Sequence, residues 1–186
     1  MRAKRASVLR GIITGATAGI AATLIMDQFL KLTSAGQKAV EKQMKLAQGE
    51  STWEIAHEQA QQEQQAAQQE DSTEIVARKL AKATGKTLDK EKKKTAGQVV
   101  HYTFGTLMGI VYGVSAELVP DVTTAAGTAY GTLLFLGADE VAVPALRLSP
   151  KRAADTPATD HLQHWAAHVV YGGSLELVRS LVKRFI

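Results

Sequence analysis

The sequence predicts an all-α protein, a four-span transmembrane helical bundle with a polar, partly amphipathic helical excursion between spans one and two. Three observations predict this fold: apolar segments of span length, glycines repeated at intervals of four residues, and a long polar stretch at 33–95. A membrane-crossing helix needs about 20 mainly apolar residues. The expected spans are 8–31, 97–119, 122–146 and 161–182.

Composition divides the chain into three parts. Residues 1–32 combine a basic start with the first span, 33–95 form the excursion, and 96–186 hold three further spans. A cleaved secretory signal is the alternative for the first part, but its apolar run reaches Leu32 and no small-x-small cleavage site follows. Cysteine is absent, which excludes disulfides, thiolate metal ligands and thiol nucleophiles.

The glycine spacing favours a membrane bundle over a soluble one. Each interior glycine costs a soluble helix about 1 kcal/mol relative to alanine. Between membrane helices, small residues four apart allow close approach of the two backbones. The glycines expected to form such packing faces are Gly11, Gly15, Gly19, Gly105, Gly109, Gly113, Gly127 and Gly131. A soluble amphipathic bundle with close helix crossings is the alternative.

The excursion is expected to be polar and mostly helical. Its middle, EQAQQEQQAAQQE, has good helix propensity but no apolar stripe, so it is either a solvated helix or partly disordered. The amphipathic stretches TWEIAHEQ and TEIVARKLAKATG flank it, and such stretches often lie in the membrane interface. The lysine run KTLDKEKKK fits contact with lipid headgroups, or simply a solvated tether.

An even number of spans places both termini on one side of the membrane. Basic residues near both ends favour the cytoplasmic side of a bacterial inner membrane. These residues are Arg2, Lys4, Arg5, Arg10, Arg179, Lys183 and Arg184. Lys90 and 92–94 argue the other way, but they end a loop of about 60 residues, where the charge rule weakens.

Ionisable side chains are expected to gather in two layers when the spans are threaded antiparallel at about 1.5 Å per residue. The first layer lies near the face opposite the termini. Its members are Asp27, His101, Asp139 or Glu140, and His164 or His168. The second layer lies near the termini and holds Glu117, Glu176, Arg10 and Arg179, which are expected to form ion pairs or hydrogen bonds. Trp165, Tyr102 and Tyr171 are expected to be interface or packing aromatics.

Four interpretations of the first layer stay open. His164 and His168 stand at i,i+4, a spacing that lets two imidazoles share a divalent metal ion such as Zn²⁺. Histidine titrates near neutral pH, which fits a proton relay or an ion path. Bis-histidine haem ligation would use His101 with His164 or His168. The fourth interpretation is a set of interhelical hydrogen bonds without any ligand. His161 is expected to lie outside the layer and to meet water at headgroup level.

The sequence indicates no enzyme class, because no Walker loop, GxSxG motif or nucleotide fingerprint is present. A second function class is a non-catalytic accessory or scaffold subunit, which would pack against a larger membrane complex or a second copy through its glycine-rich faces. The lysines at 86–94 lack interleaved aromatics, so no nucleic-acid partner is expected. The expected partner is the lipid bilayer.

Two apolar stretches carry a likeness to a known family. They read VVHYTFGTLMGIVYGVSAELVP and WAAHVVYGGSLELVRSLVKR. The matching positions are His101, Gly113, Glu117 and Pro120 in the second span, Pro144 and Pro150 in the third, and His168, Ser174, Glu176 and Arg179 in the fourth. With these residues the chain resembles the YagU-type family of small bacterial inner-membrane proteins, a domain of unknown function. The likeness covers about residues 96–184 and the glycine-rich first span.

The resemblance implies a multi-pass inner-membrane protein with a loop after the first span, and it brings no activity. The chain departs from the family pattern in its Gln-rich, charged excursion. It also departs at Asp139, which stands where the pattern admits a histidine. That difference keeps a group that binds protons or metal ions, but it weakens the haem interpretation.

Overall fold

All regular secondary structure is helical in the part that the computed structural model describes, residues 2–149 and 156–186. Its elements are α1 (Arg2–Ala47), α2 (Thr52–Gln68), α3 (Ser72–Ala83), α4 (Lys90–Leu118), η1 (Pro120–Gly127), α5 (Thr128–Phe135), η2 (Leu136–Ala142), α6 (Val143–Ala145) and α7 (Ala158–Lys183). The predicted all-α class is confirmed. Pro150 and the side chains of Arg2, Lys4 and Arg5 lie outside the described part.

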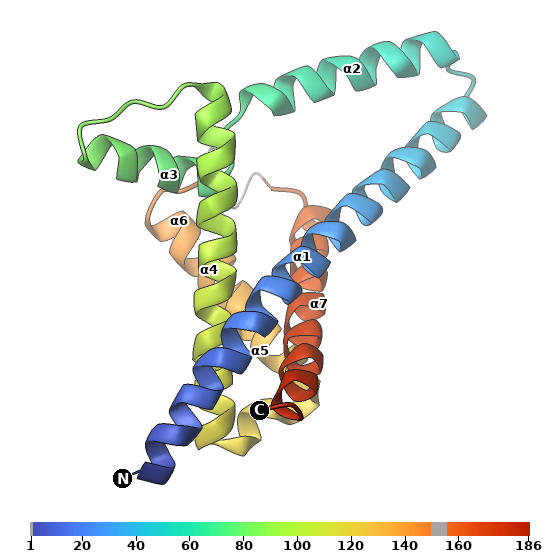
Figure 1. The fold of residues 1–186 in the computed structure, drawn as a ribbon. Coiled ribbons are helices and arrows are strands. Elements are labelled where there is room, and N and C mark those ends of the chain that lie inside the picture. Colours follow the sequence, from blue (N-terminus) through green and yellow to red (C-terminus); the bar gives the residue numbers. More distant parts are fainter. Residues whose placement is uncertain (1, 150–155) are drawn as a thin grey trace.

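Three long helices form the body of the molecule. α1 packs against both α4 and α7, and α5 packs against α7 on the other side (Figure 1). The first turns of α1 and the last turns of α7 lie at the same end, which we name the terminal end (Figure 1). α2 and α3 lie at the opposite end, which we name the excursion end. This arrangement is the one that an antiparallel bundle with an even number of crossings requires.

Each excursion helix begins at a side chain that caps it. Ser51 accepts a hydrogen bond from the backbone N–H of Glu54, whose carboxylate in turn accepts from the N–H of Ser51. Asp71 caps α3 in the same way, and Asp89 accepts from the backbone N–H of Lys92 at 2.9 Å at the start of α4. Such caps satisfy N–H groups that the first turn leaves without partners. The Gln-rich stretch is therefore a defined helix, α2.

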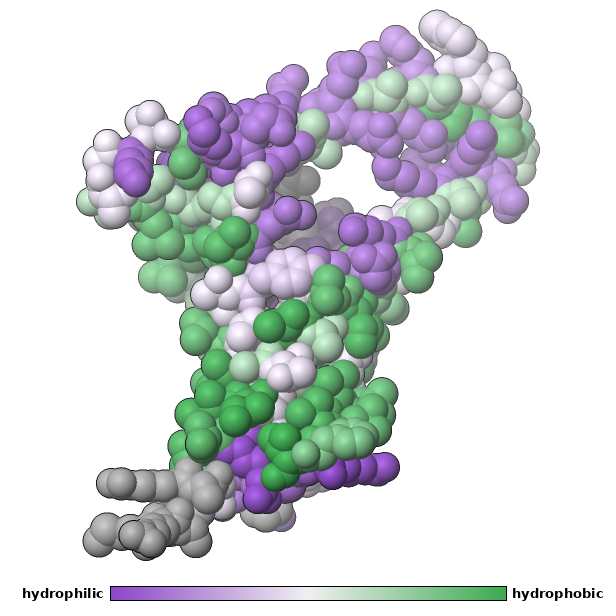
Figure 2. All heavy atoms as spheres, in the orientation of Figure 1, coloured by the Kyte–Doolittle hydropathy of each residue, from purple (hydrophilic) through white to green (hydrophobic). Residues whose placement is uncertain are grey.

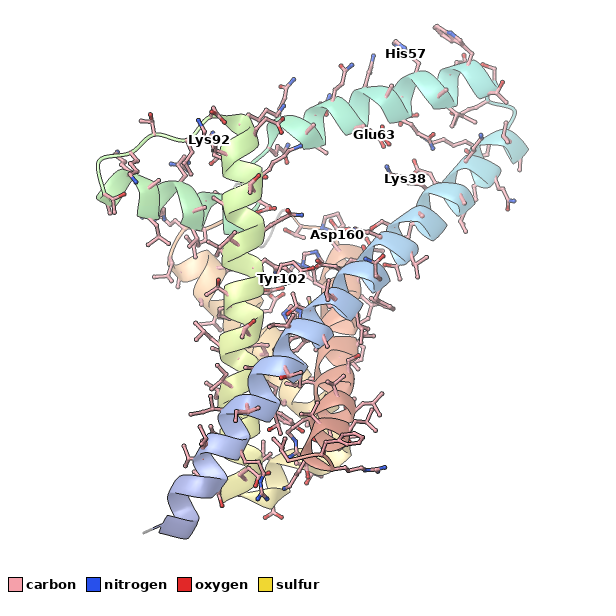
Figure 3. The ribbon with its side chains drawn as sticks, viewed as in Figure 1. Lys38, His57, Glu63, Lys92, Tyr102 and Asp160 are labelled. Atoms are coloured by element: carbon pink, nitrogen blue, oxygen red, sulfur yellow. The ribbon has the colours of Figure 1, made fainter. Side chains whose placement is uncertain are left out.

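α1 extends well past the expected end of the first span and forms an arm with α2. The two helices are joined by ion pairs between Lys38 and Glu63, 2.8 Å apart, and between Lys45 and Glu58 (Figure 3). Ile55 is fully buried, as expected for the apolar side of TWEIAHEQ, whereas Trp53 is 70% exposed. The arm is thus held mainly by charged pairs rather than by an apolar core.

α3 lies against the beginning of α4 and fixes the excursion to the bundle. Glu70 accepts from Lys93 Nζ at 2.6 Å and from Arg78 Nε at 2.7 Å, and these two cations hold the pKa of Glu70 below its usual range. Lys79 Nζ donates to the backbone carbonyl of Leu146 at 3.0 Å, just beyond α6. Gly97 gives α3 room, since a Cβ there would lie 2.8 Å from Glu74 Cγ.

Backbone contact between glycines joins α1 to α4. A Cβ on Gly11 would lie 2.7 Å from Val114 Cα, and one on Gly15 or Gly109 would meet the backbone of the facing helix just as closely. The glycines on the two faces are Gly11, Gly15 and Gly19 on α1, and Gly105, Gly109 and Gly113 on α4. Small-xxx-small faces of this kind permit the shortest helix separations.

A second close contact joins the chain before and within α5 to α7. A Cβ on Gly172 would lie 3.0 Å from Gly131 Cα, and one on Gly131 would meet the carbonyl of His168. Gly127 also faces Gly172, and it follows Ala125 and Ala126, whose φ angles are 56° and 51°. Left-handed backbone costs a non-glycine residue roughly 1–2 kcal/mol, so this turn stores strain that the close contact to α7 offsets.

Among the described residues, two helices are long and apolar enough to cross a membrane, within Ser7–Ala47 and Lys90–Leu118. They coincide with the first two predicted spans. The third predicted span is not one regular helix, because it begins in the strained turn of η1 and contains the π-helical turn η2. The fourth coincides with α7, whose histidines and charged residues lower its hydropathy. The four-span bundle is thus not confirmed by helix length and hydropathy.

The buried core lies where α1, α4 and α7 meet. Its members are Ala18, Ala22, Met26, Tyr112, Ala167, Tyr171 and Leu175. On α1, the glycines face α4 while the alanines face this core. Small side chains on both faces let α1 approach both neighbours closely, and the large side chains of Tyr112, Tyr171 and Leu175 fill the centre.

We predict that Gly15→Ala destabilises the protein although alanine favours helices. Its Cβ would clash with the backbone of Gly109, which has no side chain to move aside, and overpacking typically costs about 1–3 kcal/mol. Gly36→Ala is the matched control in the same helix, because nothing lies within 4 Å of its Cβ. Thermal unfolding in detergent should show a lower midpoint for Gly15→Ala and an unchanged or slightly higher one for Gly36→Ala. Equal midpoints would contradict the contact.

We predict that acid loosens α3 from α4 through Glu70. Because the folded pKa of Glu70 is lowered, its stabilising contribution is present above about pH 5 and is lost progressively below about pH 4. Amide hydrogen exchange in α3, corrected for intrinsic rates, should rise over that interval. Glu70→Gln should show the faster exchange already at pH 7, whereas Glu91→Gln, which alters an exposed carboxylate nearby, should behave like the wild type. Wild-type protection in Glu70→Gln would refute this role.

Candidate functional site

Asp27 joins α1 to α4 near the excursion end. His101 Nε2 lies 3.0 Å from Asp27 Oδ1, and the Tyr102 hydroxyl donates to Oδ2 at 2.8 Å. Each carboxylate oxygen therefore has its own partner. The Gly19–Gly105 contact lies two turns from Asp27 on α1 and one turn from His101 on α4, and it brings the two helices within reach of these hydrogen bonds. Sequence reasoning placed Asp27 and His101 in one layer, and they do lie together.

Asp139 lies beside two histidines of α7. Its Oδ2 is 3.6 Å from His164 Nδ1 and 3.9 Å from His168 Nδ1. His168 Nδ1 also lies 2.9 Å from the backbone carbonyl of His164, which engages the same nitrogen, and its ring lies against Phe135. His168 is buried, whereas His164 keeps 59% of its side chain exposed. His164 is therefore the histidine of this pair that meets water.

Glu140 and His161 form a third pair. His161 Nδ1 lies 2.6 Å from Glu140 Oε1, and both side chains are about one-third exposed. Sequence reasoning had treated Glu140 as the alternative to Asp139 and had placed His161 at headgroup level. Both carboxylates face α7 because they stand in η2, whose π-helical turn widens the helix. Such turns are frequent at functional sites.

A cavity of about 410 Å³ connects the pairs of Asp139 with His164 and of Glu140 with His161 to the excursion. One wall consists of Ala66 and residues 69–72, at the joint between α2 and α3. The other wall holds Asp139, Glu140, Asp160, His161 and His164, with Phe135, Val143 and Pro144 as its apolar part. Carboxylates outnumber imidazoles along the cavity, so its interior attracts cations, protons included. The surroundings of Asp139 and His164 are thus polar and wide enough for several water molecules.

The five residues of the predicted layer form two groups rather than one centre. Asp27 and His101 lie between α1 and α4, whereas Asp139, His164 and His168 lie between η2 and α7. Within residues 2–149 and 156–186, no three His, Asp or Glu side chains converge as metal ligands. The expected divalent-metal site, which needs at least three convergent protein ligands, is not formed by these side chains. The haem interpretation used His101 as an iron ligand, but the Nε2 of this residue already faces Asp27.

Charged residues also cluster at the terminal end. Arg179 donates to both carboxylate oxygens of Glu176 at 2.7 and 2.8 Å, and Tyr112 donates to the same group at 2.8 Å. Glu117 lies 3.5 Å from Arg179 and 2.5 Å from Lys183. The cluster pairs two carboxylates with two cations, so it is neutral overall and joins α4 to α7.

Arg10 is not part of this terminal cluster. Its side chain is exposed and forms no ion pair with any described residue. Lys183 takes the place that sequence reasoning had given to Arg10. The signal that could have identified Lys183 is its spacing of four residues from Arg179, which puts both cations on one face of α7. When Lys183 is considered only as part of a basic C-terminus, its alignment with Arg179 on one face of α7 is missed.

The middle of the bundle separates the two polar ends. Tyr171 donates its hydroxyl to the carbonyl of Gly105 at 2.6 Å, and Tyr130 donates to the carbonyl of Met108 at 2.8 Å. Both hydroxyl protons are thus committed to backbone acceptors. Ala18, Ala22 and Ala167 fill the remaining space with apolar surface. This packing lies between the terminal end and the two histidines that line the cavity, His161 and His164.

The glycine faces pack inside the chain. Those of α1 and α4 face each other, and Gly127 and Gly131 face Gly172 of α7. The accessory-subunit interpretation required these faces to meet a separate partner, and in this fold that surface is already covered. Tyr102, predicted to be an interface or packing aromatic, instead holds Asp27, and no spacing rule marked it because the partner lies in another helix.

Comparison with known proteins places the chain among proteins without an assigned activity. A family model described as "Protein of unknown function (DUF1440)" matches residues 56–177. No curated protein matches, and no solved structure matches. The matched region runs from within α2 to Leu177 of α7, so it contains His101, Asp139 and the histidines of α7 but not Asp27. It also contains Glu117 and Glu176 of the terminal cluster.

We predict that Arg179→Leu strongly destabilises the protein, because it leaves the carboxylate of Glu176 without its two charge-assisted hydrogen bonds in a buried site. Removing one partner of a buried ion pair typically costs about 3–5 kcal/mol. Arg184→Leu removes the same charge from an exposed position near the same end and should cost little. Thermal unfolding of the two variants in detergent checks this difference. Similar midpoints would mean that the terminal cluster does not stabilise the α4–α7 contact.

Proposed function

The chain belongs to the DUF1440 family of proteins of unknown function, and from this premise we propose that it is a four-span bacterial inner-membrane protein that binds and releases protons at its excursion end. The observation that carries the proton assignment is the contact of Asp139 with His164, 3.6 Å apart on the wall of the cavity. The resemblance to YagU-type proteins noted from the sequence supports the choice of membrane.

An apolar belt supports the membrane placement. Figure 2 shows hydrophobic side chains over the middle of the molecule and hydrophilic ones gathered at both ends. Large exposed hydrophobic residues come from all four predicted spans. They include Ile12, Ile13, Ile20, Leu24, Phe104, Leu107, Val111, Leu133, Leu136, Leu162, Leu177 and Leu181. In water such a continuous surface would be an aggregation liability, whereas lipid covers it.

The lengths of the last two spans come close to the thickness of a hydrocarbon core or exceed it. Residues 128–145 are continuously helical through α5, η2 and α6, which gives about 27 Å at 1.5 Å per residue. α7 is longer still. A hydrocarbon core is about 30 Å thick. The polar residues of η2 and α7 that lower the hydropathy face the cavity and the terminal cluster rather than the belt, which is the usual arrangement for ionisable groups in membrane bundles.

The His–carboxylate pairs supply the proton chemistry. A neutral imidazole accepts a proton near physiological pH, and an adjacent carboxylate stabilises the imidazolium that results. Asp139 is positioned to do this for His164, and Asp27 lies within hydrogen-bond distance of His101. The hydroxyl of Tyr102 holds the second oxygen of Asp27, so this carboxylate stays oriented towards His101.

Proton exchange takes place with one side of the membrane only. His164 and His161 line the cavity at the excursion end. Towards the terminal end, Tyr171 and Tyr130 donate to backbone carbonyls, and the glycine contacts exclude water. Since the positive-inside rule favours cytoplasmic termini, the cavity would face the periplasm.

Proton uptake by purified protein in lipid nanodiscs tests this proposal, once extraction with alkaline carbonate has placed the protein in the membrane fraction. A pH jump from 8 to 5 is followed with an indicator dye in wild type, His164→Gln and His57→Gln. His57 lies on the exposed face of α2 and calibrates the signal of one surface imidazole. His164→Gln should lose about one proton per chain, as His57→Gln does.

Two results would overturn the proposal. Recovery of the protein in the carbonate supernatant would refute the membrane placement. Unchanged proton uptake in His164→Gln, with the expected loss in His57→Gln, would show that His164 does not exchange protons with the cavity.

A further inference from the structure

The excursion end carries lysines that the proton site does not use. α4 begins with the sequence KEKKK, and cations in the first turn of a helix face the positive end of its dipole. Lys93 is paired with Glu70, and Lys92 with Asp89. In the described part of the chain, neither Lys90 nor Lys94 lies within ion-pair distance of a carboxylate. Two unpaired ammonium groups four residues apart on one helix repel each other.

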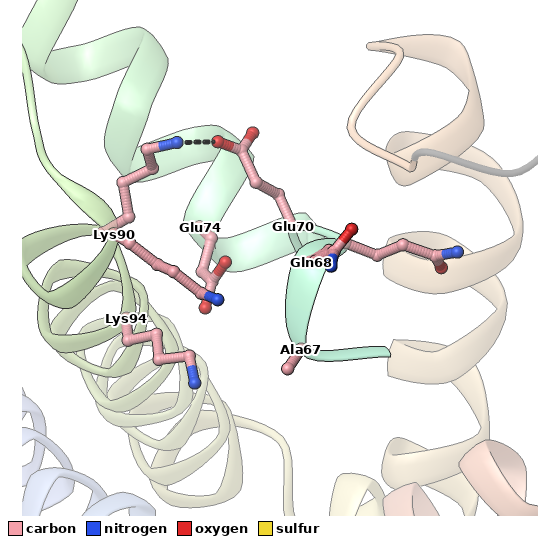
Figure 4. Close-up of a pocket in the computed structure, with 8 residues that line it drawn as sticks. Ala67, Gln68, Glu70, Glu74, Lys90 and Lys94 are labelled. Carbon is pink, nitrogen blue, oxygen red and sulfur yellow. Dashed lines mark hydrogen bonds and ion pairs between the residues drawn. The ribbon is translucent and has the colours of Figure 1, made fainter. Parts of the chain in front are cut away.

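Lys90 and Lys94 line a pocket of about 210 Å³, which we name the lysine pocket. Its remaining wall consists of Lys93 and of Ala67, Gln68, Gln69, Glu70 and Glu74 from the α2–α3 joint. Figure 4 shows Lys90 and Lys94 on α4 facing Glu74 and residues 67–70. Glu70 is shared by Lys93 and Arg78, so the cations around the pocket outnumber the carboxylates. The pocket therefore favours an anion.

The depth of the lysine pocket identifies the kind of anion. The second span begins near residue 97, about 5 Å below Lys94 along α4 at 1.5 Å per residue. Val99, in the next turn, is 62% exposed and belongs to the apolar belt. α3 lies across this start of the span, with Leu80 59% exposed. Ammonium groups within about two turns of the start of the span lie at the level of lipid headgroups, where the matching anion is the phosphate of a phospholipid.

We propose that the lysine pocket binds the phosphate of an anionic phospholipid, with Lys90 and Lys94 as its two ligands. The lipid neutralises the unpaired charges at the start of α4, and it fixes the α2–α3 joint, which is also a wall of the proton cavity, against the membrane surface. This inference rests on the proposed membrane placement but not on proton binding.

Native mass spectrometry of the full-length protein released from detergent tests the assignment. The probes are phosphatidylglycerol, phosphatidylcholine and inorganic phosphate. Wild type should retain phosphatidylglycerol at least fivefold more than phosphatidylcholine, and Lys90→Gln/Lys94→Gln should lower this preference to less than twofold. The control Lys82→Gln/Lys86→Gln removes the same charge from two neighbouring exposed lysines outside the pocket, and it should keep the wild-type preference.

Four outcomes overturn the assignment. Equal loss in both double variants means diffuse attraction rather than a pocket. An unchanged preference in Lys90→Gln/Lys94→Gln means that other residues bind the lipid. Retention of inorganic phosphate with the same lysine dependence means that the pocket takes a free anion. Protein that stays in the membrane fraction but shows no preference for phosphatidylglycerol contradicts this inference alone, whereas protein absent from that fraction contradicts the proposed function.

Discussion

Backbone contact between glycines is the constraint on which the rest of this structure depends. Where Gly15 meets Gly109 and Gly131 meets His168, no side chain separates the helices, so the distance between them is set by main-chain atoms. In the proposed membrane setting, dispersion between backbones replaces the hydrophobic drive that lipid does not supply. The hydrogen bonds of Asp27 with His101 and Tyr102 are short enough to form only because α1 and α4 lie this close.

The two polar ends follow from that packing. The dry middle separates a solvated set of His–carboxylate pairs from a neutral, buried ion-pair cluster, and the two ends consequently behave differently. At the excursion end, the π-helical turn of η2 aims Asp139 and Glu140 at α7 and beside a cavity. At the terminal end, Arg179 donates to Glu176, lies 3.5 Å from Glu117 and holds α4 to α7. The excursion end places its charged pairs beside a cavity, whereas the terminal end stabilises the contact between α4 and α7.

The sequence predicted the helices, the glycine faces and a common depth for Asp27 and His101, because periodicity and depth along a helix are local properties. The sequence does not show which helices are in contact with one another. The single layer therefore proved to be two groups, and the metal ligand set that it implied does not converge. Partners supplied by another helix, such as Tyr102 for Asp27, leave no local pattern. Interruptions of the regular helix, such as η2 and the left-handed residues Ala125 and Ala126, depend on tertiary contacts that offset their strain.

The central claim is that the protein is a lipid-covered bundle open to water only at its excursion end. The reactivity of introduced cysteines tests this claim most directly, because the chain has no cysteine of its own. Protein in proteoliposomes is treated with a charged, membrane-impermeant thiol reagent. Val143→Cys on the cavity wall should react quickly, and Leu175→Cys in the core should not. Leu133→Cys should also stay unreactive although the native side chain is 67% exposed, because lipid covers it. Reaction at Leu133→Cys as fast as at Val143→Cys would contradict the account.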